Sequence, residues 1–174
     1  MEKYIPDMYQ QSIYTIDYKK LLDKGIKCIL FDLDNTLVPV TDKKPTQKLK
    51  ELFDDLKEKG FKVIIFSNSH RRRLKPFKDE LNVDCCASAR KPFKEKFLLV
   101  LREYRFNINE VAIIGDQILT DIVGGNKIGI MTILINPISN KDFFITKFNR
   151  FREKRIMKKL RDKNLFSKGR YYEL

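Results

Sequence analysis

Short apolar runs alternate along the chain with longer segments in which apolar residues recur at every third or fourth position. The runs are rich in Ile, Val and Phe and carry few charges, which is typical of buried parallel strands. We expect strands at residues 26–30, 61–66, 83–87, 111–115 and 130–135. Because single helices separate successive strands, the connections should be right-handed crossovers. The pattern predicts an α/β fold, a three-layer Rossmann-like sandwich with a mainly parallel five-stranded sheet.

The segments between the runs have the spacing of helices with one buried face. The first opens at Pro45-Thr46, ends at Gly60 and carries an apolar stripe of Leu49, Leu52, Phe53 and Leu56. Further helices are expected at about 70–81, 92–104 and 118–126, the second starting at Pro92 and burying Phe93, Phe97, Leu101 and Tyr104. Residues 1–25 should form a lead-in that packs on the sheet edge, with a short helix at 18–24.

The charge of the chain is strongly positive, with 36 Lys and Arg against 23 Asp and Glu and a net charge of +13. Such a field favours polyanionic partners, namely nucleic acid, anionic lipid headgroups or phosphorylated small molecules. Residues 141–174 hold 12 of the basic residues and 4 of the acidic ones, interleaved with Phe and Leu. We therefore divide the chain into a core with its lead-in, residues 1–140, and a basic amphipathic carboxyl-terminal extension, residues 141–174.

Two arrangements of the extension remain open. It can lie on an anionic membrane as a basic amphipathic helix, or it can pack on the core with a solvated outer face. Both hold at once if its aromatic part docks on the core while residues 154–163 stay free.

The three cysteines, Cys28, Cys85 and Cys86, stand in apolar surroundings and are expected to be reduced. The polar amino terminus does not predict a secretory signal, and the longest nearly apolar run, residues 128–135, is too short to span a bilayer. We expect a cytoplasmic protein, with peripheral attachment to the inner membrane face through the extension.

Polar residues follow the predicted strands at the ends where ligands bind in parallel sheets. They are Asp32 and Asp34 after the first strand, Ser67 after the second, Lys91 after the third and Asp116 after the fourth, with Asp121 about one helical turn further on. An apolar strand has no structural use for two carboxylates at its end, because an uncompensated buried charge is costly. A hard divalent cation is the simplest partner, and Mg²⁺ suits carboxylates combined with a substrate phosphate.

This set of groups matches the needs of phosphoryl transfer, in which one carboxylate can attack phosphorus and another can move protons. Simpler explanations exist for single residues. Asp-Asn-Thr suits turns, Ser67 could cap a helix, Lys91 could be a solvated loop lysine, and Asp121 could lie on an exposed helix face.

The ordered patterns Asp32-x-Asp34-x-Thr36, Ser67, Lys91-Pro92 and Gly115-Asp116-x-x-x-x-Asp121 resemble the four signatures of the haloacid dehalogenase superfamily phosphatases, over about residues 27–136. That resemblance implies Asp32 as the nucleophile and Asp34 as the general acid and then base. It implies Mg²⁺ bound by Asp32, the backbone carbonyl of Asp34, Asp116 and the supporting Asp121. Substrate binding is expected from Thr36, Ser67, Asn68, Lys91, Arg72 and Arg150.

The intervals between the signatures hold one helix and one strand each, which leaves no room for a cap domain. An uncovered site suits a substrate too large to enclose, such as a protein, a nucleic-acid end or a lipid in a membrane. The run Arg71-Arg72-Arg73 stands at an expected helix amino terminus, where cations are disfavoured. The run either faces an anion in the crevice or belongs to a solvated turn.

The capless arrangement, together with Thr146-Lys147-Phe148-Asn149-Arg150, resembles the YqeG branch of the superfamily, which is similar to mitochondrial phosphatidylglycerophosphate phosphatases. The resemblance implies a Mg²⁺-dependent phosphomonoesterase that converts phosphatidylglycerophosphate to phosphatidylglycerol at a membrane surface. Two alternatives remain: a phosphatase of nucleic-acid ends, and a non-catalytic protein that binds phosphate or RNA on the same fold.

Overall fold

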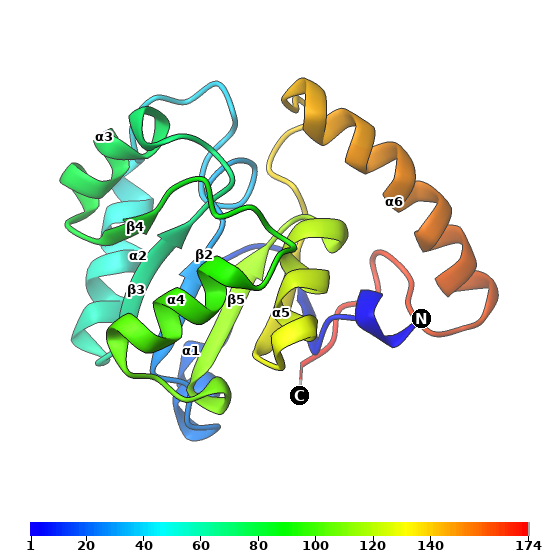
Figure 1. The fold of residues 1–174 in the computed structure, drawn as a ribbon, viewed down its shortest axis with the longest axis horizontal. Helices are drawn as coiled ribbons and strands as arrows, with labels where there is room; N and C mark the ends of the chain where they lie inside the picture. The colour runs from blue at the N-terminus through cyan, green and yellow to red at the C-terminus, as the bar shows by residue number, and fades with distance from the viewer. Residues whose placement is uncertain (174) are drawn as a thin grey trace.

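A computed structural model describes residues 1–173 and shows one sheet of six parallel strands in the order β1-β6-β5-β2-β3-β4 (Figure 1). The strands are β1 (Met8–Gln10), β2 (Cys28–Phe31), β3 (Lys62–Phe66), β4 (Asp84–Cys86), β5 (Val111–Gly115) and β6 (Met131–Ile135). The predicted α/β Rossmann-like fold is confirmed, and the described residues include no cap domain. The sheet has six strands rather than the predicted five.

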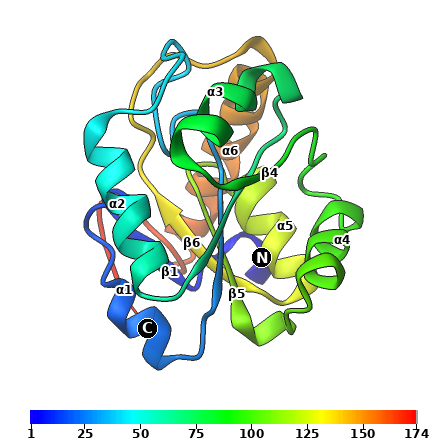
Figure 2. The same cartoon turned by 90° about the vertical axis from the view of Figure 1, so that its left-hand side faces the viewer.

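Helices cover both faces of the sheet, which gives the three layers seen edge-on in Figure 2. One layer holds α1 (Tyr18–Asp23), α2 (Gln47–Glu58) and α3 (Arg71–Leu81), and the other holds α4 (Glu95–Tyr104), α5 (Val123–Ile128) and α6 (Phe144–Asp162). Side chains of β2 alternate between the layers because successive strand residues point to opposite faces. Ile29 and Phe31 pack with the first layer, and Cys28 and Leu30 pack with the second.

The additional strand, β1, lies within the predicted lead-in. Met8 and Gln10 of this strand pair in parallel with Ile133 and Ile135 of β6. Tyr9 also exchanges backbone hydrogen bonds with Tyr172 near the carboxyl end, at 3.0 and 2.9 Å. The lead-in therefore reaches the sheet edge as predicted, but it extends the sheet instead of only packing against it.

Two helices differ from their predictions, one in its first residue and one in its helical type. Helix α4 starts at Glu95, and Phe93 is 61% exposed, so the prediction that Pro92 opens a helix and Phe93 is buried is wrong. The physical reason is a turn closed by the Phe93 N–H and the Arg90 carbonyl at 2.9 Å, which directs Lys91 inward. The helix predicted at 118–126 is a π-helical turn, Ile118–Ile122, continued by α5.

The carboxyl-terminal extension forms helix α6, and the arrangement in which its aromatic part docks while residues 154–163 stay free is contradicted. Leu160 is fully buried with Phe166 against Tyr9, and Ile156 and Met157 pack on the same cluster. The aromatic residues at the start of the helix are exposed instead. None of the helices described in residues 1–173 has the length and hydropathy needed to cross a bilayer.

Candidate active site

The carboxyl ends of the neighbouring strands β2 and β5 lie side by side at the point where the strand order changes direction, and the candidate site lies there. Asp32 follows β2 and donates its backbone N–H to the carbonyl of Ile114 at 2.9 Å, which extends the ladder by one residue. The chain then turns sharply through residues 33–38, with Asn35 at a φ of 63°. This turn places Asp32 and Asp34 on the wall of one cavity, as the sequence required.

Three acidic residues gather at this edge of the sheet. Asp32, Asp116 and Asp121 are all buried, and each offers a carboxylate oxygen within 4.8 Å of the others. The π-helical turn presents Asp121, which accepts the backbone N–H of Gln117 at 3.1 Å. Gly115 makes room for it, because a Cβ atom there would lie 2.2 Å from the Asp121 carboxylate carbon.

Lys91 lies against this cluster with its side chain only 2% exposed. Its Nζ donates to Asp32 Oδ1 and Asp121 Oδ1, each at 2.7 Å, and to the carbonyl of Phe66 at 2.9 Å. Asn68 fixes the backbone of Lys91, accepting its N–H at 2.7 Å and donating to its carbonyl at 3.1 Å. Lys91 is therefore a buried, hydrogen-bonded member of the site and not a solvated loop lysine.

The electrostatics of the cluster favour a bound cation. Burial raises the pKa of Asp116 to about 7 and that of Asp121 to about 6, with Arg150 and Lys91 respectively opposing the shift. Burial also opposes the charge on Lys91, but Asp121 and Asp32 outweigh it and raise the Lys91 pKa.

The charge balance of the cluster gives a direct test of whether a metal fits. The three acids of the cluster, Asp32, Asp116 and Asp121, are buried, and a fourth buried acid, Glu153, lies beside Arg150; the cations that contact these four are Lys91 and Arg150. Four carboxylates against two cations leave an excess of negative charge when all are ionised. A divalent cation supplies the missing charge, and oxygen donors at this spacing suit a hard ion, so Asp32, Asp116 and Asp121 form a divalent metal site.

The carboxylate of Asp34 is not one of the three in the cluster, although its side chain lines the same cavity. Its carboxylate accepts the Ser69 hydroxyl at 2.8 Å and the Nε and Nη2 groups of Arg73 at 3.1 and 2.8 Å. Burial raises the pKa of Asp34, and the bonds from Ser69 and Arg73 oppose this shift. A metal ligand from this residue would have to be its backbone carbonyl, as the resemblance implies.

The cavity has a volume of about 630 Å³. Besides the two aspartates it is lined by Ser67, Asn68, Ser69, His70, Arg72, Arg73, Lys91, Gln117, Thr120, Phe143, Thr146 and Asn149. Ser67 is buried, and its hydroxyl accepts the N–H of Ser69 at 3.1 Å. Arg72 is exposed at the rim.

Two residues expected to bind substrate, Thr36 and Arg150, contact Asp116. The hydroxyl of Thr36 donates to Asp116 Oδ1 at 3.1 Å, and Thr36 does not line the cavity. Arg150 donates from Nη1 to the Asp116 carbonyl at 2.8 Å and from Nη2 to the Asp116 carboxylate. The structure thus brings Asp32, Lys91, Asp116 and Asp121 together, with Thr36 and Arg150 as partners of Asp116.

Sequence reasoning missed Glu153. This residue is 4% exposed, its Oε1 accepts the N–H of Leu119 at 2.9 Å, and it lies 3.4 Å from Arg150 Nη1. Glu153 joins α6 to the π-helical turn that carries Asp121. A signal was present, because Glu153 is the one acidic residue between Asp142 and Asp162 in a basic segment.

The chain matches the haloacid dehalogenase-like hydrolase family over residues 39–129. It is 41% identical over 160 residues to "Probable phosphatase YqeG" of Bacillus subtilis, and the match covers 92% of this chain and 93% of that protein. It is also 26% identical over 147 residues to "Phosphatidylglycerophosphate phosphatase 1, chloroplastic/mitochondrial" of Arabidopsis thaliana, covering 79% of this chain but 42% of that protein.

Among solved structures, one described as a HAD superfamily (subfamily III A) hydrolase from Legionella pneumophila has a TM-score of 0.53 and 18% identity. The match covers 70% of this chain and 72% of that chain, and it supports the fold.

Proposed function

Because the chain belongs to the haloacid dehalogenase-like hydrolases, as a phosphatase of that superfamily, we propose that it hydrolyses a phosphomonoester with Mg²⁺ through an aspartyl-phosphate on Asp32. One observation supports this most directly. The carboxylate of Asp32 belongs to the buried acidic cluster, and the same residue lines an open cavity beside Asp34. A nucleophile needs both the charged support and access to substrate.

In the first step, a carboxylate oxygen of Asp32 forms a bond to phosphorus while the bond from phosphorus to the ester oxygen breaks. Asp34 gives its proton to the departing oxygen, a role that its raised pKa favours. In the second step Asp34 takes a proton from water, the water oxygen bonds to phosphorus, and the bond to Asp32 breaks. Phosphate leaves, and both side chains return to their starting states.

Other residues hold charge and geometry during these steps. Lys91 balances the developing negative charge, and Ser67 lines the same cavity. Arg73 and Ser69 keep Asp34 in one orientation. A Mg²⁺ ion held by Asp32, Asp116 and Asp121 would supply further positive charge near the phosphoryl oxygens.

For the substrate we propose a phosphorylated lipid headgroup, with phosphatidylglycerophosphate as the first candidate. The cavity opens beside exposed Phe143, and no cap covers it in the described residues. The similarity to the Arabidopsis protein supports the same candidate. The surrounding positive charge suits an anionic headgroup in an anionic membrane.

Phosphate release from a soluble phosphomonoester tests the catalytic part of this proposal. We expect Mg²⁺-dependent turnover that falls at least about a thousandfold in Asp32→Asn, because the amide cannot form the intermediate. Asp54→Asn is the matched control, since this aspartate is 69% exposed on α2. Equal activity in both variants would contradict a nucleophilic Asp32.

The substrate is tested in the same assay with detergent-dispersed phosphatidylglycerophosphate beside short oligonucleotides phosphorylated at the 3′ or 5′ end. We expect faster release from the lipid. Release from the oligonucleotides alone would favour the nucleic-acid end phosphatase, and no release from any substrate would favour a non-catalytic binding protein.

A further inference from the structure

The outward face of α6 carries an exposed row of phenylalanines. Phe144, Phe148 and Phe151 are spaced by four and three residues, which places them on one side of the helix. They are 88%, 63% and 54% exposed, and Phe143, directly before the helix, is 46% exposed. Large apolar side chains grouped on one face in this way mark an interaction site.

The packing of α6 prevents this row from turning inward. On the opposite side of the helix, Glu153 and Leu160 are 4% and 0% exposed. Glu153 accepts the N–H of Leu119 at 2.9 Å, and Arg150 contacts Asp116. Rolling the helix to bury the phenylalanines would break these contacts and expose Leu160. The fold therefore holds the aromatic row in solvent.

Positive charge surrounds the row. Helix α6 contains eight Lys and Arg against two Asp and Glu. Lys147, Arg152 and Arg155 are exposed, and among residues 1–173 no acidic group forms an ion pair with them. The guanidinium of Arg155 lies 4.7 Å from the centre of the Phe151 ring. These cations are available to an anionic partner.

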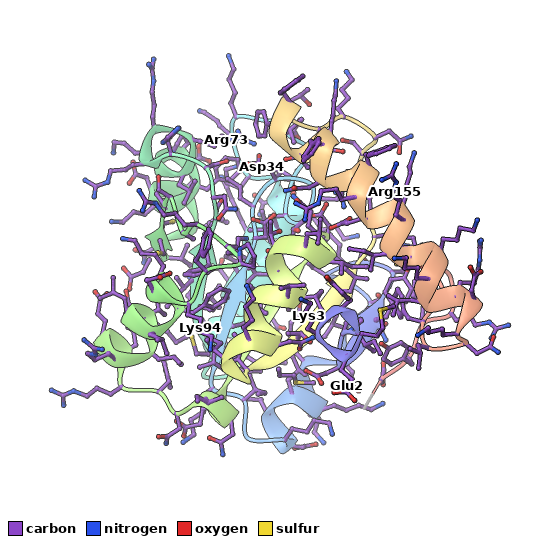
Figure 3. All side chains as sticks on the ribbon, turned by 45° about the vertical axis from the view of Figure 1, so that its right-hand side comes forward. Glu2, Lys3, Asp34, Arg73, Lys94 and Arg155 are labelled. Carbon is purple, nitrogen blue, oxygen red and sulfur yellow. The ribbon has the colours of Figure 1, made fainter. Side chains whose placement is uncertain are left out.

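The row also borders the mouth of the catalytic cavity. Phe143, Thr146 and Asn149, from the start of α6 and the residue before it, line the cavity on one side, and Arg72 lies on its rim. In Figure 3 the labelled Asp34 and Arg73 lie near the upper end of α6, and Arg155 lies further along the helix. A surface that binds this end of α6 would therefore lie next to the cavity mouth.

We propose that Phe143, Phe144, Phe148 and Phe151, with the flanking Lys147, Arg152 and Arg155, form a docking surface for an anionic lipid bilayer. Aromatic side chains enter the headgroup boundary, while Lys and Arg bind anionic headgroups. Phenylalanine rings can also stack on unpaired bases, but exposed phenylalanines grouped on one helix face and flanked by Lys and Arg have the composition of a helix that lies in a membrane interface, so the chemistry of the row favours a bilayer. The docking surface itself rests on the geometry of α6, and its use in presenting a lipid substrate to Asp32 rests on the proposed function.

The natural chain has no tryptophan, which allows a direct test with the full-length protein. Phe148→Trp introduces a single indole into the row, and Leu98→Trp introduces one at a 42% exposed position on α4. Vesicles of phosphatidylcholine with phosphatidylglycerol should shift the emission of the first variant to the blue and leave that of the second unchanged. Vesicles of phosphatidylcholine alone, or high salt, should weaken the shift.

Co-sedimentation with the same vesicles gives the size of the effect. The affinity of the double variant Phe144→Ser/Phe148→Ser for vesicles should fall at least about tenfold, because removing each apolar ring from water contributes substantially to the free energy of binding. The control Leu98→Ser/Ile108→Ser removes two other exposed apolar side chains and should bind as the natural protein does. Equal blue shifts in both Trp variants, equal binding by both double variants, or emission changes with single-stranded RNA but not with vesicles would overturn the docking surface.

Turnover of a soluble phosphomonoester distinguishes this inference from the proposed function. Turnover without vesicle binding would overturn the docking surface and leave the catalytic proposal standing. Vesicle binding without turnover of soluble or lipid phosphomonoesters would overturn the proposed function and support the docking surface.

Discussion

Arg150 supports a buried carboxylate, and its removal should have a large and specific effect. The side chain of Arg150 is 16% exposed and that of Asp116 is 0% exposed, so their ion pair is largely shielded from water. In Arg150→Ala the Asp116 carboxylate keeps the Thr36 hydroxyl at 3.1 Å but loses its cation. Breaking a buried ion pair by removing one partner costs about 3–5 kcal/mol.

That cost predicts a clear change in melting temperature. For a chain of this length each kcal/mol lowers Tm by about 2–4 °C, so metal-free Arg150→Ala should melt at least about 6 °C below the natural protein. Mg²⁺ should restore part of the loss, because the metal can replace the missing positive charge beside Asp116. Without Arg150 the Asp116 carboxylate keeps an uncompensated negative charge, so the variant should bind Mg²⁺ more tightly and its Tm should rise more at the same Mg²⁺ concentration; a ligand at a hundred times its Kd contributes about 2.7 kcal/mol.

Thermal unfolding followed by circular dichroism, in EDTA and over a Mg²⁺ series, measures both quantities. Arg152→Ala is the matched control, since it removes an exposed arginine two residues away that forms no ion pair with residues 1–173. We expect a change of no more than about 2 °C in this control. The reasoning is refuted if both variants shift Tm equally, or if Mg²⁺ raises the Tm of Arg150→Ala no more than that of the natural protein.

Two further variants test the geometry of the site. Gly115→Ala places a Cβ atom 2.2 Å from the Asp121 carboxylate carbon and should reduce phosphatase activity at least about a hundredfold. The fall in Tm that it causes should be smaller in an Asp121→Gly background, and Tm changes that add fully in the double variant would contradict the contact. Arg73→Ala removes the bonds from α3 to the carbonyls of Pro39 and Asp42, so exchange of the backbone amides of residues 40–42 should quicken about tenfold. Arg72→Ala, at an exposed position, should leave this exchange unchanged, and the same rate in both variants would count against the role of Arg73.

The buried strands were predictable because their sequences permit few alternatives. Residues 111–115 form β5 with the predicted bounds, since five apolar or small residues buried on both faces suit only an inner strand. Strand β1 escaped prediction because it has three residues, one of them Gln10, and its partner β6 lies more than 120 residues away. Such an edge strand exists through its long-range pairing and has no local pattern of its own.

The same distinction applies to the site. Asp32 and Asp116 each follow a strand, so the topology alone indicates that they meet. The directions of Thr36 and Arg150 depend on how a loop and a helix pack around Asp116, and sequence spacing does not fix that packing. Glu153 was missed for the same reason, since only the docked position of α6 brings it to Leu119.

Helix α6 cannot be regarded as an accessory to the catalytic core. The family match ends at residue 129, yet Arg150 and Glu153 reach back from α6 to Asp116 and Leu119. The division of the chain at residue 140 remains a prediction, but the charge balance of the metal site already includes one cation and one acid from beyond it. Since the inner face of α6 neutralises Asp116 and its outer face holds the phenylalanines, one helix fixes the distance between the acidic cluster and whatever surface the phenylalanines bind.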